Sequence, residues 1–287
     1  MTAAAPQSND RFAAASTRLS GYMIADKFEK TITATDDADS TALRTARIIA
    51  RGVRQAAADK KIALDGSQRI NPAHLSPHID NLVNIFNRVA LSENYHAWQA
   101  ERRRALAQSL ASDPSFPRLL SGWRKAPGDI LLETATTFTK TYQRLYEVPA
   151  TTVPFRVTWL RAGCGYTGEH RAPAPGKTEH CLAFNVGKDS EFRDPAIGLN
   201  ALHHENTHAT QTALAAAFRH DRIKPDHPLY RDARLLFMLT EETESYILHT
   251  PAYHAHPLER DAFDQADDFI TDLKAALKIK GVSPLLG

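Results

Sequence analysis

The sequence predicts an α+β protein that is predominantly helical, with a small β-sheet confined to the second half of the chain. Apolar residues recur at steps of three and four positions through most of the first half, which is the pattern of amphipathic helices. Two short segments, 151–160 and 181–186, alternate apolar with polar residues, as half-buried strands do. The alanine-rich segment 194–220 follows them and has no proline after Pro195, which indicates one long helix.

Composition and charge narrow the class of protein. The chain has 287 residues, enough for one large or two modest domains, and its 43% hydrophobic and 24% charged residues are ordinary for a globular protein. The formal net charge is only +2, which gives no electrostatic reason to expect nucleic acid or an anionic membrane as a partner. No apolar run reaches the roughly 18 residues of a membrane span. We therefore expect neither nucleic acid nor a membrane as the main partner.

Three regions are expected along the chain: a poorly ordered leader at 1–40, a helical domain at 41–147 and a second domain at 148–287. The leader is rich in alanine, serine and threonine, and it lacks the basic start and apolar core of a secretory signal. A cytoplasmic location, or export without a classical signal peptide, is therefore expected. The two cysteines, Cys164 and Cys181, favour two free thiols, although a single bridge is conceivable in an oxidising compartment.

Four helices are expected in the first half, at 41–62, from 72 or 75 to 91, from 93 to about 110, and at 130–146. Ser92 is placed to cap the third of them. Three consecutive arginines, 102–104, lie on that helix, and we interpret them as a solvated face in preference to an anion-binding patch. The helical half could be a pro-segment or lid, a platform for a partner, or a scaffold.

The second half begins with the two strands, separated by a loop at 163–179 that is rich in glycine and proline. A connection at 189–195 leads into the long helix, where Pro195 suits the first turn. Two further helices are expected, one at 229–248 and one opened by Pro257.

The long helix carries the pattern His-Glu-x-x-His at residues 204–208. Two histidines four residues apart project from one face of a helix, so both imidazoles can reach one metal ion. Glu205 lies between them, where a general base is needed beside an activated water. Zinc suits this donor set, because it accepts neutral imidazole and carboxylate in a tetrahedral site with one open position. The sequence therefore predicts a zinc site with His204 and His208 as ligands.

A catalytic zinc site with two histidines commonly adds a glutamate, and two candidates follow along the chain. Glu259 lies in the first turn of the helix opened by Pro257, and the small Ala262 three residues on permits close approach to the motif helix. Glu241 or Glu242 is the alternative, in the acidic cluster of the helix before it. Both have plainer explanations, since acidic residues suit a first helical turn and acidic runs usually face solvent.

Residues 150–270 resemble the zincin superfamily of metallopeptidases, specifically bacterial and phage-type domains with the motif HExxHAxQ followed by YxxxPxExxA. The matching positions are His204, Glu205, His208, Ala209, Gln211, Tyr253, Pro257, Glu259 and Ala262. The resemblance implies a minimal zincin-like domain at 148–287, and it places Glu259 ahead of Glu242 and Glu241 as third ligand. The metzincin pattern is not met, because its glycine and third-histidine positions are Gln211 and Leu214. The helical half matches no family.

The predicted function is a zinc-dependent metallopeptidase in which Glu205 takes a proton from the attacking water and passes it to the leaving amine. Gln211 is placed for a supporting bond to His208. His203 points about 100° around the helix from His204 and is expected to be a bystander. Tyr246, Tyr253, His254 and His256 are candidates to stabilise the oxyanion, although ordinary packing is favoured for each.

Two other functions stay open. The chain could be a non-catalytic zinc-binding or regulatory module, but a structural site would favour four protein ligands, usually with cysteine, and would not require Glu205. It could also be a helical interaction protein in which the motif is accidental. Stoichiometric zinc separates the first two functions from the third, and a Glu205→Gln variant separates the first two from each other.

Overall fold

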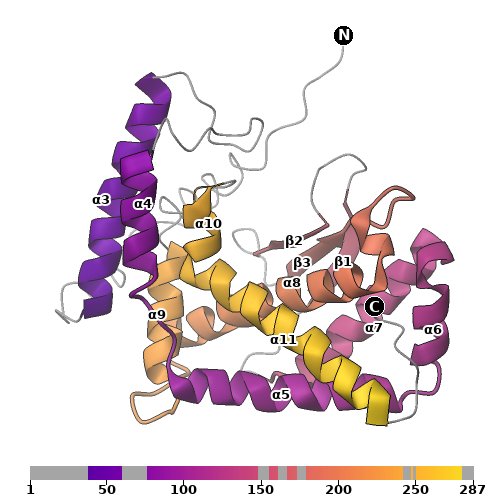
Figure 1. The fold of residues 1–287 in the computed structure, drawn as a ribbon. Coiled ribbons are helices and arrows are strands. Elements are labelled where there is room, and N and C mark those ends of the chain that lie inside the picture. Colours follow the sequence, from indigo (N-terminus) through magenta and orange to yellow (C-terminus); the bar gives the residue numbers. More distant parts are fainter. Residues whose placement is uncertain are drawn as a thin grey trace.

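The computed structural model describes residues 38–59, 76–147, 155–160, 167–172, 179–241, 247 and 250–279. The expected disordered leader therefore lies outside the described residues, except for its last three positions, which belong to a helix. Most of the described chain is helical, with one small sheet, which confirms the expected class (Figure 1). No described helix has an 18-residue stretch apolar enough to cross a membrane.

Nine α-helices and two short 3-10 helices are described, and their bounds agree with most of the expected segments. They are α3 (Ala38–Asp59), α4 (Ser76–Phe86), α5 (Glu93–Ser112), α6 (Phe116–Gly122), η2 (Trp123–Lys125), α7 (Gly128–Leu145), η3 (Glu191–Arg193), α8 (Pro195–Arg219), α9 (Tyr230–Glu241), α10 (Pro251–Ala255) and α11 (Pro257–Ile279). The short α6, η2 and α10 were not expected from the sequence. The expected helix at 229–248 is described as α9 up to Glu241, and residues 242–246 lie outside the described part.

The sheet has three described strands in the order β1-β3-β2. The outer strand β1 (Phe155–Trp159) runs parallel to the central β3 (His180–Phe184), and β2 (Gly168–Arg171) is antiparallel to β3 on the other side. The prediction of a loop at 163–179 is therefore wrong at β2. Its residues Gly-Glu-His-Arg have low strand propensity, so pairing with β3 decides their conformation.

The helix expected to reach residue 91 ends at Phe86 instead, and α11 contacts the chain at this end. Arg260 of α11 donates hydrogen bonds to the carbonyl oxygens of Phe86 (3.2 Å) and Val89 (2.6 Å). The Phe86 carbonyl oxygen also accepts from the Val89 amide at 3.1 Å, a bond between residues three apart that replaces the α-helical pattern. The chain turns there, and Val89 is fully buried before Ser92 caps α5, as expected, by accepting from the Tyr95 amide.

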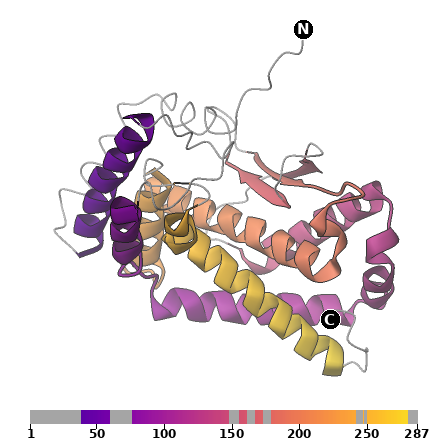
Figure 2. The same ribbon diagram turned by 45° about the horizontal axis from the view of Figure 1, so that its top comes forward.

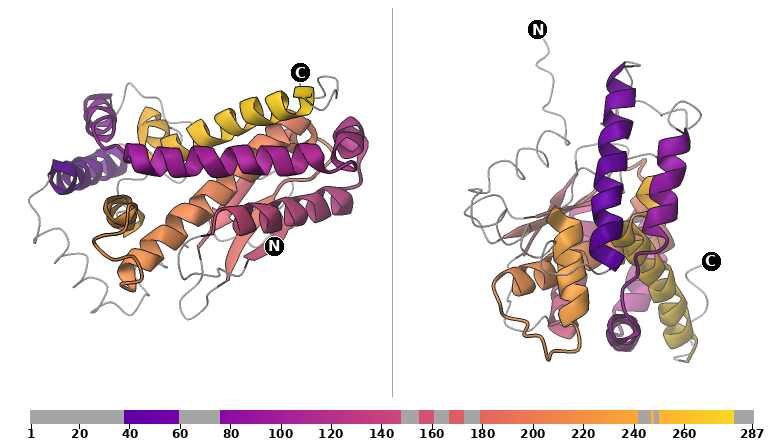
Figure 3. Two further views of the ribbon diagram at one scale, coloured as in Figure 1. Left: turned by 90° about the horizontal axis from the view of Figure 1, so that it is seen from below. Right: turned by 90° about the vertical axis from the view of Figure 1, so that its left-hand side faces the viewer.

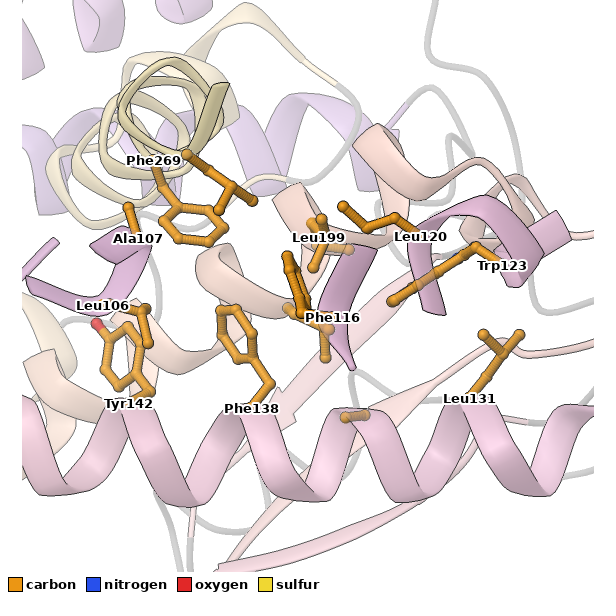
Figure 4. Packing of buried hydrophobic residues seen from close by; sticks show 14 of the residues in the cluster. Leu106, Ala107, Phe116, Leu120, Trp123, Leu131, Phe138, Tyr142, Leu199 and Phe269 are labelled. Atoms are coloured by element: carbon orange, nitrogen blue, oxygen red, sulfur yellow. The ribbon is translucent and has the colours of Figure 1, made fainter. Parts of the chain in front are cut away.

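The main hydrophobic core lies where α5, α7, α8 and α11 meet beside the sheet (Figures 2 and 3). Phe138 of α7 packs edge-on against Phe269 of α11, with ring centroids 5.6 Å apart, and Leu106 of α5 lies close by (Figure 4). Residues before and after the expected boundary at 148 contribute to this one cluster. The same region holds Arg103, whose buried guanidinium pairs with Asp272 at 2.8 Å, so the middle arginine of the triplet is structural and not a solvated face.

A helical hairpin formed by α3 and α4 stands against one end of this body (Figure 1). The buried positions of α3 are small or aliphatic and follow steps of three and four: Leu43, Ala46, Ala50, Val53 and Ala57. The last four of these pack on Ile79, Leu82 and Phe86 of α4 and on Ala252 of α10, and Leu43 belongs to a second cluster with residues of α8 and α9. This stripe is the a/d pattern that brings two helices together along their length.

Candidate metal centre

The site is built on the middle of α8, and the start of that helix is fixed by specific contacts. Asp194 caps it by accepting from the amides of Ala196 (3.0 Å) and Ile197 (3.4 Å), and Pro195 occupies the first turn as expected. A Cβ added at Gly198 would lie 2.6 Å from the carbonyl oxygen of Phe192. Glycine therefore lets η3 approach α8, and the motif begins almost two turns further along the helix.

His204, His208 and Glu259 come together, as expected from the sequence. Their ligating atoms form one compact group in which the two histidine Nε2 atoms are 3.1 Å apart. Glu259 Oε2 lies 3.4 Å from His204 Nε2, and Glu259 Oε1 lies 3.2 Å from His208 Nε2. Glu259 is 1% exposed and His204 is 7% exposed. A carboxylate and two imidazoles thus converge on one buried point from two helices.

Glu259 reaches this point from the first turn of α11, which packs along α8. Ala262 is fully buried, as expected for a small residue at the contact between the two helices. Glu241 ends α9 and lies 3.8 Å from the Arg219 guanidinium, away from the histidines. Glu242 lies outside the described residues. Of the described candidates for third ligand, the structure brings Glu259 to the histidines and leaves Glu241 apart.

Within the group, the carboxylate and the histidines each stabilise the charged form of the other. Burial alone would lower the pKa of His208, but the Glu259 carboxylate raises it to about 9. Burial alone would raise the pKa of Glu259, yet His208 and His204 hold it at about 2. A buried carboxylate that stays ionised needs a positive partner close by. In the protein without metal, protonated histidine fills that role.

Glu205 lies between the two ligands and faces strand β2. Burial raises the pKa of its carboxyl, and the two histidines and the backbone amide of His170 oppose that shift. A Cβ added at Gly168 would lie 2.9 Å from Glu205 Cγ. Glycine at this position therefore allows β2 to approach helix α8 closely.

Two further histidines lie beside the site, and sequence reasoning did not single them out. His170 Nε2 on β2 is 2.8 Å from His180 Nδ1 on β3, and the His170 ring lies parallel to that of His208 with centroids 6.5 Å apart. Burial lowers the pKa of His180 to about 4 and that of His170 well below its usual range. The pair is therefore neutral at pH 7. Only the pairing of β2 with β3 brings these residues together, and no spacing in the sequence indicates it.

The donor set fits zinc. Ligand atoms placed tetrahedrally about 2.0–2.2 Å from zinc lie about 3.3–3.6 Å from one another, close to the separations of 3.1, 3.2 and 3.4 Å found here. Glu259 Oε2 is buried and makes no hydrogen bond among the described residues, an unsatisfied acceptor that a cation would satisfy. Three protein ligands are the number in a catalytic zinc site. Cys181 is a buried free thiol outside the group, and Cys164 lies outside the described residues.

The other candidate residues take different positions. His203 points into the core, where its ring stacks on Phe269, so it is a bystander as expected. His256 is fully buried with its ring against Phe86, which agrees with a packing role. The ring of His254 lies 5.3 Å from that of Phe263, which in turn contacts the His204 ring at 4.5 Å.

The remaining candidate oxyanion donors are Tyr253 and Tyr246. The Tyr253 ring contacts His254 at 5.2 Å, and Tyr246 lies outside the described residues.

The chain matches no protein-family model, no curated protein and no solved structure. The motif and the geometry of the site are therefore the basis for assigning a function.

Proposed function

We propose that the protein is a zinc-dependent metallopeptidase of the zincin type. The observation that carries the proposal is the convergence of His204, His208 and Glu259 on one buried point, with Glu205 on the same helix between the two histidines. The three ligands come from two motifs about fifty residues apart in the sequence. An accidental His-Glu-x-x-His pattern on a helix gives no reason for a third acidic ligand to meet the pair.

Each residue has a role in peptide hydrolysis. His204 and His208 would hold the ion through Nε2, and Glu259 through a carboxylate oxygen. Zinc in such a site supplies Lewis acidity, which lowers the pKa of a water molecule and polarises a peptide carbonyl. Glu205 takes the proton of the attacking water and passes it to the leaving amine. The His170 amide favours the ionised form of Glu205, the form that accepts this proton.

The substrate is a protein or peptide in an extended conformation. In the described sheet β2 pairs with β3 on one side only, and its Gly168 lies against the Glu205 side chain. An extended peptide can add to such an edge through main-chain hydrogen bonds. This arrangement would bring a peptide bond past Glu205 and the ligands.

Metal content and cleavage together test the proposal. Purified protein is expected to hold one zinc per chain, and His204→Ala is expected to lose it. Glu205→Gln is expected to keep zinc and to lose cleavage of a casein-type substrate by about 100- to 10,000-fold, the usual contribution of a general base. Zinc without cleavage in the unmodified protein would identify a non-catalytic zinc-binding module instead. Absence of bound zinc would reject both functions.

A further inference from the structure

A chain of buried hydrogen bonds leads away from His208 on the side opposite the ligand group. His208 Nδ1 is 2.9 Å from Gln211 Oε1, and Gln211 Nε2 donates to Asp261 Oδ2 at 2.8 Å. The hydroxyl of Tyr95, on α5, donates to the same Asp261 oxygen at 2.8 Å. Gln99 completes the chain by donating to the Tyr95 hydroxyl at 2.7 Å. The chain thus joins α8, α11 and α5.

The partners fix the direction of every bond in this chain. Gln211 Nε2 also faces the carbonyl oxygen of Leu258, at 3.0 Å. A carbonyl and a carboxylate oxygen only accept, so the nitrogen of the Gln211 amide must face them and its oxygen must face His208. An amide oxygen also only accepts, so Nδ1 of His208 must carry the proton. The lone pair of a neutral His208 is then on Nε2, the atom that faces Glu259 and His204.

His204 has no comparable support. Its Nδ1 is buried and has no hydrogen-bond partner among the described residues. Two ligands on one helix therefore differ: the ring of His208 is oriented by a chain that reaches another helix, and the ring of His204 is held by packing against Phe263.

We infer that Gln211, Asp261 and Tyr95 are positioning residues that hold His208 as an Nε2 metal ligand and tie the metal site to helix α5. The inference rests on the metal site of the proposed function and is independent of peptide cleavage. Outer partners that orient a ligating histidine typically change metal affinity by about 10- to 100-fold when removed. Gln211 is the glutamine of the HExxHAxQ pattern. Through Asp261, its hydrogen bonds connect His208 to Tyr95, which precedes Gln211 by more than one hundred positions in the sequence.

The test measures zinc affinity by competition with a chelator, together with the imidazole nitrogen signals of the zinc-loaded protein labelled with ¹⁵N-histidine. In the unmodified protein we expect a slowly exchanging Nδ1 proton on His208. Gln211→Leu is expected to weaken zinc binding about 10- to 100-fold and to expose that proton to exchange. Asp261→Ala is expected to weaken zinc binding and to expose the proton in the same way, but to a smaller extent. Asp261→Asn keeps an oxygen for Gln211 and Tyr95 and is expected to stay within about threefold of the unmodified protein, below the range for a lost partner.

Thr139→Val is the matched control, because it removes a buried hydrogen bond from Asn206 of α8 (3.2 Å) on the side away from the ligands. It is expected to leave zinc affinity and the His208 signals unchanged. Zinc affinity in Gln211→Leu equal to that of the unmodified protein would overturn the inference and leave the proposed function standing. Equal losses in Asp261→Ala and Asp261→Asn would also overturn it. Failure of the unmodified protein to bind zinc would remove the metal site and the inference with it.

Discussion

Helix α8 carries two buried polar faces, and they are satisfied in different ways. On the core-facing side, His203 Nε2 lies 3.2 Å from the Tyr146 hydroxyl and its Nδ1 lies 3.4 Å from the Thr207 hydroxyl, so both ring nitrogens have partners. On the other side, His204 and His208 point their Nε2 atoms at each other and at Glu259. The adjacent residues His203 and His204 thus differ: the first has a hydrogen-bond partner for each ring nitrogen, and the second faces a carboxylate and another imidazole.

The difference shows how a structural histidine and a ligating histidine can be told apart. A neutral imidazole has one donor and one acceptor, and the partners of His203 supply the complement of each. The group at His204 instead places an ionised carboxylate and two imidazole nitrogens together, a set that is balanced only when a positive charge is added. Buried donors and acceptors that satisfy one another indicate a structural role, and buried acceptors that converge on one point indicate a cation site.

Loss of the third ligand is expected to have the largest effect. Glu259→Ala removes the carboxylate of the set, so zinc affinity is expected to fall by more than about 100-fold, beyond the upper end of the losses seen for outer partners. Chelator competition measures it. Glu241→Ala is the control, since Glu241 lies beside Arg219 and away from the histidines. Equal zinc affinity in the two variants would show that Glu259 is not a ligand.

Removal of the core-facing histidine is expected to affect stability and leave the metal untouched. His203→Ala leaves a cavity beside Phe269 and an unpaired Tyr146 hydroxyl, which together are expected to cost about 2–4 kcal/mol of unfolding free energy. Denaturant unfolding checks the stability, and chelator competition checks that zinc affinity is unchanged. A loss of zinc without a loss of stability would reverse the roles assigned to the two faces.

The neutral buried histidines are expected to make stability fall in mild acid. Burial lowers the pKa of His180 to about 4, and burial, with His208 and Arg260 nearby, lowers that of His256 to about 3. Both lie below the value of about 6.5 in an unfolded chain, so the unfolded state binds more protons as pH falls below about 6.5.

Each of these two histidines is therefore expected to contribute stability that is fully present above pH 6.5 and decreases by about 1.4 kcal/mol per pH unit between its unfolded and folded pKa. Urea unfolding of metal-free protein between pH 7.5 and 5 measures the decrease, and His180→Gln is expected to reduce the slope. An unchanged slope in that variant would contradict the assignment of a neutral His180.

The smallest effect is expected from a single hydroxyl on the core-facing side. Thr207 donates to the His203 carbonyl oxygen at 3.0 Å and lies 3.5 Å from the Tyr142 hydroxyl. Thr207→Val keeps the shape of the side chain and removes these bonds, so a loss of about 1 kcal/mol is expected. Thermal unfolding with and without zinc measures it. A change in the stabilisation that zinc provides would mean that this face takes part in metal binding.

The parts of the molecule that the sequence predicts well are those with local signals. Helix α8 is the main example, because all of its signals lie within one segment. They are its helical run of residues, the start at Asp194 and Pro195, and the spacing of His204 and His208, and each is found where it was expected. Glu259 could be named as a candidate because Pro257 marks the start of its helix, and the resemblance to zincin domains placed it ahead of Glu241 and Glu242. Tertiary contacts contribute to the rest: β2 pairs with β3, and Arg260 of α11 binds the Phe86 carbonyl oxygen where α4 ends early.

The supporting residues of the site were the hardest to predict. His170 and His180 meet across two strands, and Tyr95 meets Asp261 from a helix far away in the sequence. No periodicity relates such positions, since only the path of the folded chain brings them together. Gln211 is the exception, because it lies one helical turn from His208 and its bond was expected from the spacing alone.

The contact between Arg260 and the α4–α5 connection determines which truncated fragments of the chain keep the surroundings of Glu259 intact. Arg260 follows Glu259 directly and donates to carbonyl oxygens of residues 86 and 89. Truncation before Ser92 would leave the guanidinium without these acceptors, next to the residue that completes the ligand set. Residues 86–89 therefore support the start of α11, from which Glu259 reaches the candidate metal centre, and a fragment comprising the second half alone would lack this support.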